Sequence, residues 1–293
     1  MTTTSDSSQR LTLFAFFLTA LLGGGNSVAV RFSNVELAPY WGATIRLGSS
    51  ALLFWLIVFL WRIPIPQRRD AIVLLLTGFF GVGVSFGLLY FGFVKLQASL
   101  GSVIIAMGPL MTFFFAILHG LEKFRWKSLF GGMIALTGIA IAARAQLGVN
   151  IPVLSVLALV AGSAISAEGN VILKIFSPKS DPMATNALTL SAGLALLLLV
   201  SFLMGETHNL PTLPATWIAI TYTVIPGSVI MFYLFVWLLA RWSASATSYV
   251  IMLFPIVATI AGSLLAGETI TLTFILGGAL VLVGVWIGAL MKK

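Results

Sequence analysis

Long uninterrupted stretches of apolar residues constrain this chain more than any other feature. Ten such runs, each of about 20 residues, are separated by short polar segments. About 20 residues of α-helix span the hydrocarbon core of a bilayer, whereas spanning strands need only about 10 residues of alternating polarity. Only 8% of the 293 residues are charged, and the mean hydropathy is +1.09, whereas a soluble domain has roughly 25% charged residues. The sequence therefore predicts an all-α polytopic membrane protein.

The positions of lysine and arginine predict how the helices are oriented. The expected helices cover residues 11–30, 39–60, 71–93, 98–119, 128–143, 152–172, 183–203, 216–239, 244–265 and 271–290. If the N-terminus is cytoplasmic, the cytoplasmic segments carry 12 lysine and arginine residues and the opposite side carries 3. Short cytoplasmic loops are enriched in these residues. We therefore expect ten transmembrane helices with both termini in the cytoplasm.

The second half of the sequence repeats the first at an offset of 146 residues. Residues 98–144 and 244–290 share 13 identities in 47 gapless positions, and the same register pairs Gly81 with Gly227 and Phe86 with Phe232. Each copy contains five expected helices, which is an odd number, so the two copies cross the membrane in opposite directions. We predict two inverted five-helix repeats, residues 11–144 and 152–291. This plan is frequent in secondary transporters, and an old duplication in a structural protein is the alternative.

Two ionisable residues lie well inside the expected helices, Arg46 and Glu168. A charge near the centre of a membrane helix costs ~2.5–3.5 kcal/mol or more, so such residues usually serve a function. At 1.5 Å per residue, Arg46 lies ~10 Å and Glu168 ~24 Å from the outer ends of their helices, and one small zwitterion does not reach both. We predict that Arg46 binds a substrate carboxylate and that Glu168 takes part in proton coupling. The alternatives are that Arg46 snorkels to the outer headgroups and that Glu168 pairs with a neighbouring helix near the cytoplasmic face.

Uncharged polar and aromatic residues form a second group of candidates. Asn26 follows three glycines, Gly23, Gly24 and Gly25, which either form a hinge or allow close helix packing. The aromatic side chains would line an apolar cavity, and aromatic belts at the two membrane interfaces are the alternative. The predicted substrate-binding residues are Arg46, Asn26, Phe86, Tyr90, Trp237 and Tyr249.

Pro109 and Pro255 occupy matching positions near the middle of the fourth and ninth expected helices. Proline removes a backbone donor and kinks a helix, so we predict that both residues shape a gate or a cavity wall. A kink that only sets the shape of the helix is the alternative. Gly284 and Gly288 form a GxxxG pattern in the last expected helix, which would provide a face for a weak homodimer if the chain is not monomeric.

Several protein classes are disfavoured by what the sequence lacks. Residues 83–87 (GVSFG) match GxSxG, but a nucleophile elbow needs a strand-to-helix turn, and this match lies inside an expected membrane helix. The sequence has no Walker A motif, no HExxH pattern and no cysteine. It also leaves no room for a basic, water-facing domain that would bind nucleic acid. We expect no enzymatic activity, no cofactor and no bound metal; the expected partners are a small molecule and the lipid bilayer.

Each copy of the repeat has an Ala-Ser-x-x-Ser stretch before the proline, a glutamate after it, and a later Gly-Gly-x5-Gly. These residues are Ala98, Ser99, Ser102, Pro109, Glu122, Gly131, Gly132 and Gly138, and Ala244, Ser245, Ser248, Pro255, Glu268, Gly277, Gly278 and Gly284. This repeated pattern resembles the drug/metabolite transporter superfamily, specifically its EamA-type members, and among these the sequence looks most like the YddG-type amino-acid exporters of bacterial inner membranes. The resemblance implies export through a central cavity lined mainly by helices three, four, eight and nine, with helices five and ten at the periphery.

Taken with that resemblance, the sequence predicts a secondary transporter that exports amino acids and related small metabolites by alternating access. Aromatic or other neutral amino acids are the expected substrates, and the bacterial inner membrane is the expected location. Efflux of lipophilic cations or nucleosides by the same fold is the alternative within transport. A membrane enzyme or scaffold without transport is the alternative outside it.

Overall fold

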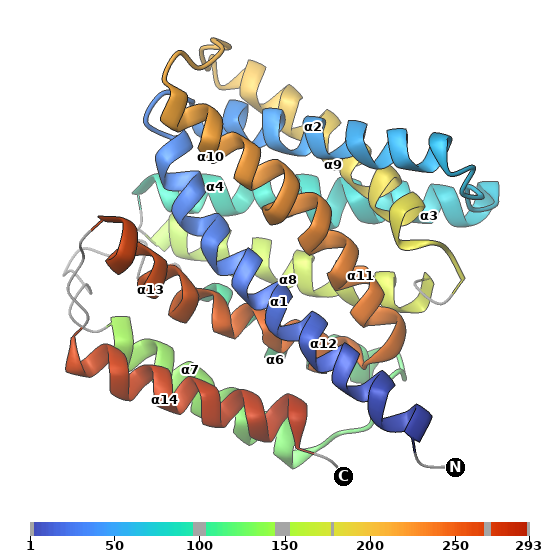
Figure 1. The fold of residues 1–293 in the computed structure, drawn as a ribbon, viewed down its shortest axis with the longest axis vertical. Coiled ribbons are helices and arrows are strands. Elements are labelled where there is room, and N and C mark those ends of the chain that lie inside the picture. The colour runs from blue at the N-terminus through green and yellow to red at the C-terminus, as the bar shows by residue number, and fades with distance from the viewer. Residues whose placement is uncertain (1–2, 96–103, 144–152, 177–178, 267–270, 292–293) are drawn as a thin grey trace.

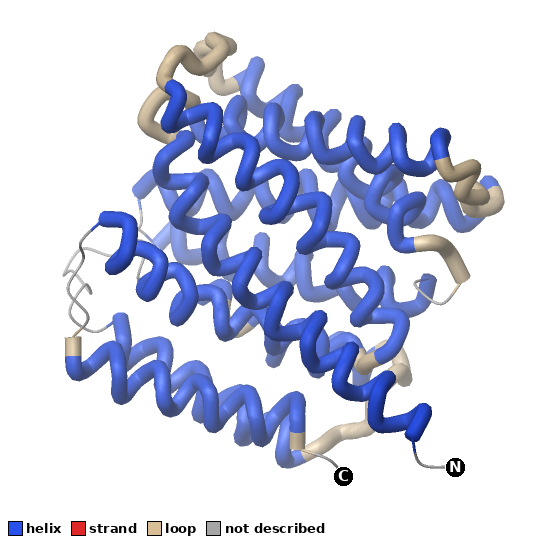
Figure 2. Tube along the Cα trace, in the orientation of Figure 1, coloured by secondary structure: helices blue, strands red, loops and turns tan. Residues whose placement is uncertain are grey.

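The computed structural model describes residues 3–95, 104–143, 153–176, 179–266 and 271–291, and within these ranges every regular element is helical (Figure 2). The elements are α1 (Thr3–Ser33), α2 (Pro39–Leu60), α3 (Arg68–Gly78), η1 (Phe79–Val84), α4 (Ser85–Lys95), α6 (Gly108–Leu118), α7 (Trp126–Ala143), α8 (Val153–Phe176), α9 (Pro182–Leu203), α10 (Pro214–Val224), η3 (Ile225–Ile230), α11 (Met231–Arg241), α12 (Ala244–Ser248), η4 (Tyr249–Leu253), α13 (Phe254–Ala266), α14 (Leu272–Val285) and η5 (Trp286–Leu290). Eight spans in the described ranges are long and apolar enough to cross a membrane, and two shorter apolar helices accompany them. The predicted all-helical membrane fold is confirmed.

The two halves of the sequence interleave in space. α2 packs on α9, α4 on α8, α1 on α10 and α13, and α7 on α14. Figure 1 shows α2 and α9 along one side of the molecule and α7 and α14 along the opposite side, with α1 and α8 between them. Because each of these pairs joins an early helix to a late one, residues of both halves meet throughout the bundle.

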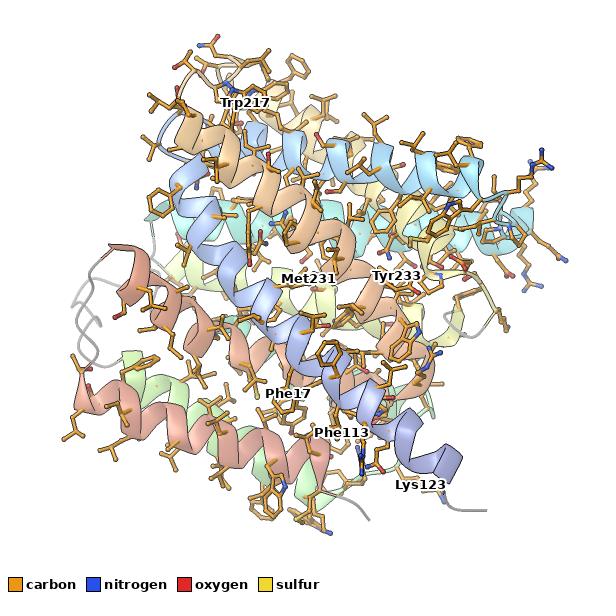
Figure 3. All side chains as sticks on the ribbon, in the orientation of Figure 1. Phe17, Phe113, Lys123, Trp217, Met231 and Tyr233 are labelled. Carbon is orange, nitrogen blue, oxygen red and sulfur yellow. The ribbon has the colours of Figure 1, made fainter. Side chains whose placement is uncertain are left out.

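The outer surface of the bundle suits a lipid environment. Large apolar side chains point outward from many helices; Leu52, Phe59, Leu203 and Leu264 are each more than 60% exposed. In water such a surface would be unfavourable, whereas lipid tails accept it without cost. Figure 3 shows Trp217 and Lys123 at opposite ends of the molecule, as expected for residues at the two faces of a membrane.

Three loop glutamates cap helices that belong to the opposite half of the chain. Glu206 accepts hydrogen bonds from the first backbone N–H groups of α2, and Glu36 accepts from the backbone that leads into α10. Glu122 accepts from the Ser245 backbone N–H (2.9 Å) and from its hydroxyl (2.5 Å) at the start of α12. The repeated glutamate and Ala-Ser pair thus meet across the halves. The equivalent residues of the other copy lie outside the described ranges: Ala98, Ser99, Ser102 and Glu268.

The repeated glycines bring α7 and α14 into backbone contact. A Cβ on Gly131 would lie 2.5 Å from the Gly288 nitrogen, and one on Gly138 would lie 2.5 Å from the Gly277 carbonyl oxygen. Gly284 likewise faces the α7 backbone. The expectation that Gly284 and Gly288 offer a dimer face is wrong, because α7 of the same chain covers Gly284 and the Tyr249 ring of η4 covers Gly288.

Pro109 and Pro255 each follow directly after an irregularity of the helix, and Pro255 lies near the middle of the apolar span Ala244–Leu264. Pro109 is the second residue of α6, after a turn at Ala106 and Met107. Pro255 is the second residue of α13, after the 3-10 segment η4. The first turn of a helix tolerates proline because its N–H groups have no intrahelical partner. Each proline therefore restarts a broken helix, and the breaks lie at matching places in the two halves.

Two π-helical segments also fall at matching places. η1 covers Phe79–Val84 and η3 covers Ile225–Ile230. The first residues of the two segments are 146 positions apart, and so are their last residues. A π-helical turn widens the helix to i→i+5 hydrogen bonds and often marks a functional position. The continuous helices expected at 71–93 and 216–239 are therefore each interrupted near their middle.

Candidate functional site

Two residues of the second π-helical segment form hydrogen bonds with a buried arginine. Arg46 of α2 is 8% exposed. Its Nε donates to the Ser228 hydroxyl (2.8 Å), and its Nη2 donates to the Gly227 carbonyl oxygen (3.2 Å). The Ser228 hydroxyl in turn donates to the Thr223 carbonyl oxygen five residues earlier (2.8 Å). The guanidinium is thus held by η3 inside the bundle, and the alternative that Arg46 snorkels to the headgroups is wrong.

Asn26 of α1 completes the polar shell of Arg46. With the amide oxygen of Asn26 turned toward the guanidinium, it accepts from Nη2 (2.8 Å) and Nη1 (3.0 Å) of Arg46. We adopt this orientation because the opposite one would point donors at donors. Gly227 leaves the space for this amide, since a Cβ there would overlap the Asn26 side chain. One guanidinium therefore ties helices of both halves together.

The three glycines before Asn26 lie within the uninterrupted helix α1 and permit close packing. A Cβ on Gly23 would overlap the Phe254 ring, and one on Gly25 would overlap the Tyr222 hydroxyl. Gly24 faces α13 in the same way. The structure therefore shows the packing alternative at Gly23, Gly24 and Gly25, and their absent side chains let α1 approach α10 and α13.

Aromatic rings surround the arginine on its other side. The guanidinium carbon of Arg46 lies 5.9 Å from the centre of the Phe232 ring, which is within the range of a cation–π contact. Tyr90 of α4 is half-buried, and it packs with Phe232 against the apolar cluster that includes Leu47, the neighbour of Arg46 in α2. The Tyr90 ring lies 6.5 Å from that of Phe86 and 5.9 Å from that of Tyr40. These rings form an apolar wall beside a single positive charge.

This positive charge has no carboxylate partner among the described residues. The ion pairs His119–Glu168 and Arg125–Glu122 do not include Arg46. Its acceptors are a hydroxyl, a carbonyl and an amide, all of them neutral. An unpaired charge away from water is costly. We call Arg46, Asn26, Gly227, Ser228, Tyr90 and Phe232 the arginine centre.

Two of the predicted binding residues lie elsewhere. Tyr249 is fully buried among α7, η4 and η5, where its hydroxyl donates to the Ser128 carbonyl oxygen. Trp237 stacks beneath Arg241, whose guanidinium carbon lies 3.6 Å from the ring centre. The structure brings together Arg46, Asn26, Tyr90 and Phe86, and it gives Tyr249 and Trp237 packing contacts away from them.

Glu168 lies beside the first π-helical segment and not beside Arg46. Its Oε1 is 2.6 Å from Nε2 of His119, the residue that ends α6. The alternative that Glu168 pairs with a neighbouring helix is thus confirmed. Its other carboxylate oxygen, Oε2, is buried and has no hydrogen-bond partner in the described part of the chain.

The loop glutamate Glu36 illustrates the electrostatics at the membrane face. The hydroxyls of Thr212 and then Thr216 stabilise the carboxylate, with further help from backbone N–H groups, and they lower the pKa of Glu36 from 4.5 to about 2. The hydrogen bond from the Thr212 hydroxyl is 2.6 Å long. The carboxylate form of Glu36 is therefore favoured well into the acidic range, and it binds the backbone that leads into α10, the helix before η3.

Sequence reasoning missed Ser228 and Phe232 as members of the arginine centre. Phe232 could have been found, because the offset of 146 pairs it with the predicted Phe86. Gly227 pairs with Gly81 in the same register. Nothing in the sequence marks Ser228, since serines are frequent in these helices and the π-helical turn that presents it was not predicted.

An all-helical, lipid-facing bundle is that of a polytopic membrane protein, and a buried charge such as Arg46 in such a bundle marks a substrate or ion pathway. The EamA-like transporter family matches residues 10–144 and 153–289, and the chain belongs to this family. The drug/metabolite transporter resemblance seen in the repeated residues is thereby confirmed.

The relatives extend over nearly the whole chain. An uncharacterized transporter of Archaeoglobus fulgidus is 24% identical over 274 residues, with 92% of this chain and 95% of that protein covered. The inner membrane transporter YedA of Escherichia coli is 27% identical over 269 residues, with 90% and 86% covered. A probable terminal-alkyne amino-acid exporter of Streptantibioticus cattleyicolor is 26% identical over 221 residues, with 75% and 73% covered.

The fold also has a solved counterpart. A crystal structure superposes with a TM-score of 0.81 at 17% identity, covering 96% of this chain and 98% of the other. Together with the apolar helices and the inner-membrane relative, the family places this protein in the inner membrane as a multi-pass protein.

Proposed function

We propose that this protein is a secondary transporter that exports amino acids or related small carboxylates, and that Arg46 binds the substrate carboxylate. Ten helices in two inverted halves, residues 11–144 and 152–291, with both termini in the cytoplasm, would carry it out by alternating access. Asn26 and Ser228 orient the guanidinium, and Phe86, Tyr90 and Phe232 form the apolar wall against the substrate side chain.

The observation that carries this proposal is the unpaired charge of Arg46. Its hydrogen bonds to Asn26, Gly227 and Ser228 use neutral acceptors and leave the positive charge uncompensated by any described carboxylate. A substrate carboxylate would supply that charge, and it would form charge-assisted hydrogen bonds of the strong kind. The ligand would then bridge α1, α2 and η3, which come from both halves of the chain.

Three further observations support the architecture and the substrate class. The 12-to-3 distribution of lysine and arginine favours cytoplasmic termini. The matched positions of η1 and η3, and of Pro109 and Pro255, support a duplication whose copies contain five helices each. The relative from Streptantibioticus cattleyicolor is itself described as a probable amino-acid exporter.

Counterflow in proteoliposomes tests the proposal. Vesicles that contain the purified full chain are loaded with a neutral amino acid, and entry of the labelled form is measured beside that of its decarboxylated amine. We expect transport of the amino acid and not of the amine. Arg46→Ala should lower it at least about 30-fold, which corresponds to the ~2 kcal/mol or more lost when a buried charge partner is removed.

A matched arginine provides the control. Arg241→Ala removes an arginine that stacks on Trp237, outside the arginine centre, and should leave counterflow unchanged. If Arg46→Ala folds and transports amino acids as well as the wild type, the carboxylate assignment is wrong. If neither amino acids nor nucleosides cross faster than in empty vesicles, the transporter proposal itself is wrong.

A further inference from the structure

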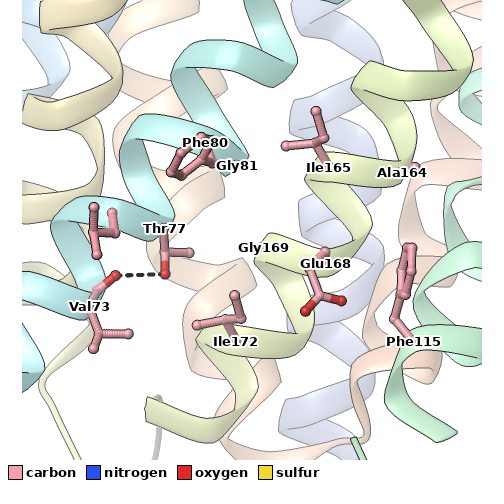
Figure 4. Close-up of a pocket in the computed structure, with 11 residues that line it drawn as sticks. Val73, Thr77, Phe80, Gly81, Phe115, Ala164, Ile165, Glu168, Gly169 and Ile172 are labelled. Carbon is pink, nitrogen blue, oxygen red and sulfur yellow. Dashed lines mark hydrogen bonds between the residues drawn. The ribbon is translucent and has the colours of Figure 1, made fainter. Parts of the chain in front are cut away.

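A second pocket lies against the first π-helical segment. It has a volume of about 540 Å³ and is lined by α3, η1, α8 and Phe115 of α6 (Figure 4). Its lining is almost entirely apolar, and the side chains at its open side, Leu76 and Phe80, are more than half exposed. Because these exposed side chains lie midway along membrane helices, the pocket opens toward the acyl chains of the bilayer.

Small residues shape the wall of this pocket. Gly81 of η1 and Gly169 of α8 face each other, and a Cβ on Gly81 would lie 3.3 Å from the Gly169 Cα. The adjacent Thr77 does not present a free hydroxyl, because it donates to the Val73 carbonyl oxygen of its own helix (2.8 Å; Figure 4). The pocket therefore offers almost no neutral hydrogen-bonding group to a ligand.

Glu168 is the one ionisable residue among those that line the pocket. His119 holds Oε1, whereas Oε2 is shielded and lacks a hydrogen-bond partner in the described ranges. Phe115 lines the same pocket as Glu168, and Figure 4 shows both side chains on its α6 side. A carboxylate next to an aromatic face is the arrangement that binds a cationic nitrogen, by charge and by cation–π attraction.

We propose that this pocket binds a cationic amphiphile that enters from the bilayer, with its nitrogen on Glu168 and its apolar body along η1 and α8. The apolar lining excludes a free amino acid, whose carboxylate would have no donor there. The carboxylate excludes an anionic amphiphile. An amino-lipid headgroup and a lipophilic amine share the required chemistry, and the site is separate from the arginine centre.

A binding measurement in lipid nanodiscs tests this site without relying on transport. The full chain is titrated with a long-chain alkyltrimethylammonium that carries a nitroxide next to the headgroup, and the immobilised fraction is measured by electron paramagnetic resonance. The matched anionic probe is the alkyl sulfonate of the same chain length. We expect saturable binding of the ammonium, at least about tenfold tighter than that of the sulfonate, and loss of this preference in Glu168→Gln.

Two further variants separate the site from general damage to the fold. Asp70→Asn removes a carboxylate from the first turn of α3, outside the pocket lining, and should bind the ammonium as the wild type does. Ala164→Phe fills the pocket and keeps Glu168, so it should also abolish binding. Thermal unfolding and gel filtration show that each variant is folded.

The outcomes that overturn the proposal are distinct. Binding of the ammonium by folded Glu168→Gln as tightly as by the wild type would contradict it, as would equal binding of the ammonium and sulfonate probes by the wild type. In a third outcome, Glu168→Gln still binds the ammonium probe but its transport no longer depends on a pH gradient. That outcome would assign proton coupling to Glu168 and exclude a ligand site. The natural cation is either an amino-lipid headgroup or a lipophilic amine, and repeating the ammonium titration in nanodiscs with and without phosphatidylethanolamine distinguishes them. Weaker binding of the probe in the presence of phosphatidylethanolamine identifies the lipid headgroup as an occupant.

Discussion

The two π-helical segments occupy equivalent positions in the two halves but face opposite kinds of charge. Two residues of η3, Gly227 and Ser228, accept hydrogen bonds from the guanidinium of Arg46, whereas η1 lines an apolar pocket that contains the carboxylate of Glu168. Gly81 and Gly227 are equivalent at the offset of 146. Gly81 abuts the backbone of α8, whereas Gly227 abuts the Asn26 side chain of α1.

The comparison separates what a duplicated chain keeps from what it changes. The backbone irregularity is kept in both halves, including the breaks before Pro109 and Pro255. The charged residues are not kept. The equivalent helices α2 and α9 begin at Pro39 and Pro182, which places Thr189 opposite Arg46. Residues 11–30 of α1 contain no acidic residue that could match Glu168 of α8. A symmetric scaffold can move between equivalent states, whereas recognition of an asymmetric ligand needs residues that break the symmetry.

The equivalent glycines provide the strongest test of this comparison. Gly227→Ala places a methyl group where the Asn26 amide now lies, so Asn26 must withdraw from Arg46 and two hydrogen bonds to a buried charge are lost. We expect amino-acid counterflow to fall about tenfold or more. Gly81→Ala meets the Gly169 Cα at 3.3 Å and needs only a small shift of α8, so counterflow should fall by less than about threefold.

Equal losses in the two glycine variants would break the comparison. They would mean that each π-helical segment matters for helix movement alone, with no special role for the arginine centre. Thermal unfolding of both variants is the control, because a variant that is merely unstable loses transport in proportion to the folded protein that remains.

Much of this arrangement could be predicted from the sequence, for reasons that are local. A run of about 20 apolar residues specifies a membrane helix whatever surrounds it, and a buried charge such as Arg46 is conspicuous because it is costly. Asn26 was predicted because it is a polar residue within a membrane helix, and it does lie beside Arg46. The π-helical segments could not be predicted, because an i→i+5 turn follows from packing between helices and not from the propensity of the residues within it.

Aromatic residues were the least predictable part of the site. Tyr90 and Tyr249 were both predicted to line the cavity because each is an aromatic residue in an apolar helix. Tyr90 packs with Phe86 on the side of Arg46, whereas the Tyr249 hydroxyl is enclosed against Ser128. A tyrosine serves equally well as a cavity wall or as a core residue with one hydrogen bond. Only the rotation of its helix decides between these roles, and hydropathy does not fix that rotation when both faces are apolar.

The serines of the two regions provide a second, weaker test. Ser228→Ala removes the acceptor for Nε of Arg46 and leaves a buried N–H without a partner, which costs ~1–3 kcal/mol. We expect counterflow to fall about five- to tenfold, mainly through a higher apparent KM. Ser85→Ala removes a hydroxyl that donates to the Gly162 carbonyl oxygen (2.9 Å) on the η1 side, so its apparent KM should stay within about twofold of wild type. The opposite ranking would move the binding site toward η1.

The helices that lead into the two segments differ as well, and this provides the smallest expected effect. α10 leads into η3 and has Glu36 at its start, whereas α3 leads into η1 and begins after Gln67 without a side-chain cap. Because the pKa of Glu36 falls from 4.5 to about 2 on folding, its contribution to stability is complete above the unfolded-state pKa. That contribution declines as the pH falls from 4.5 toward 2.

Glu36→Gln removes this pH dependence while keeping a side chain of similar shape. The apparent Tm of the purified protein should be slightly lower in the variant at about pH 6, and the difference from the wild type should shrink as the pH falls from about 5 to about 3. The effect is small because Glu36 lies in a surface loop, where water and salt weaken its hydrogen bonds. If the Tm curves of the variant and the wild type stay parallel through this range, Glu36 does not stabilise the start of α10. The two π-helical segments would then differ in the charge they face, and the helices that lead into them would not differ in how they are anchored.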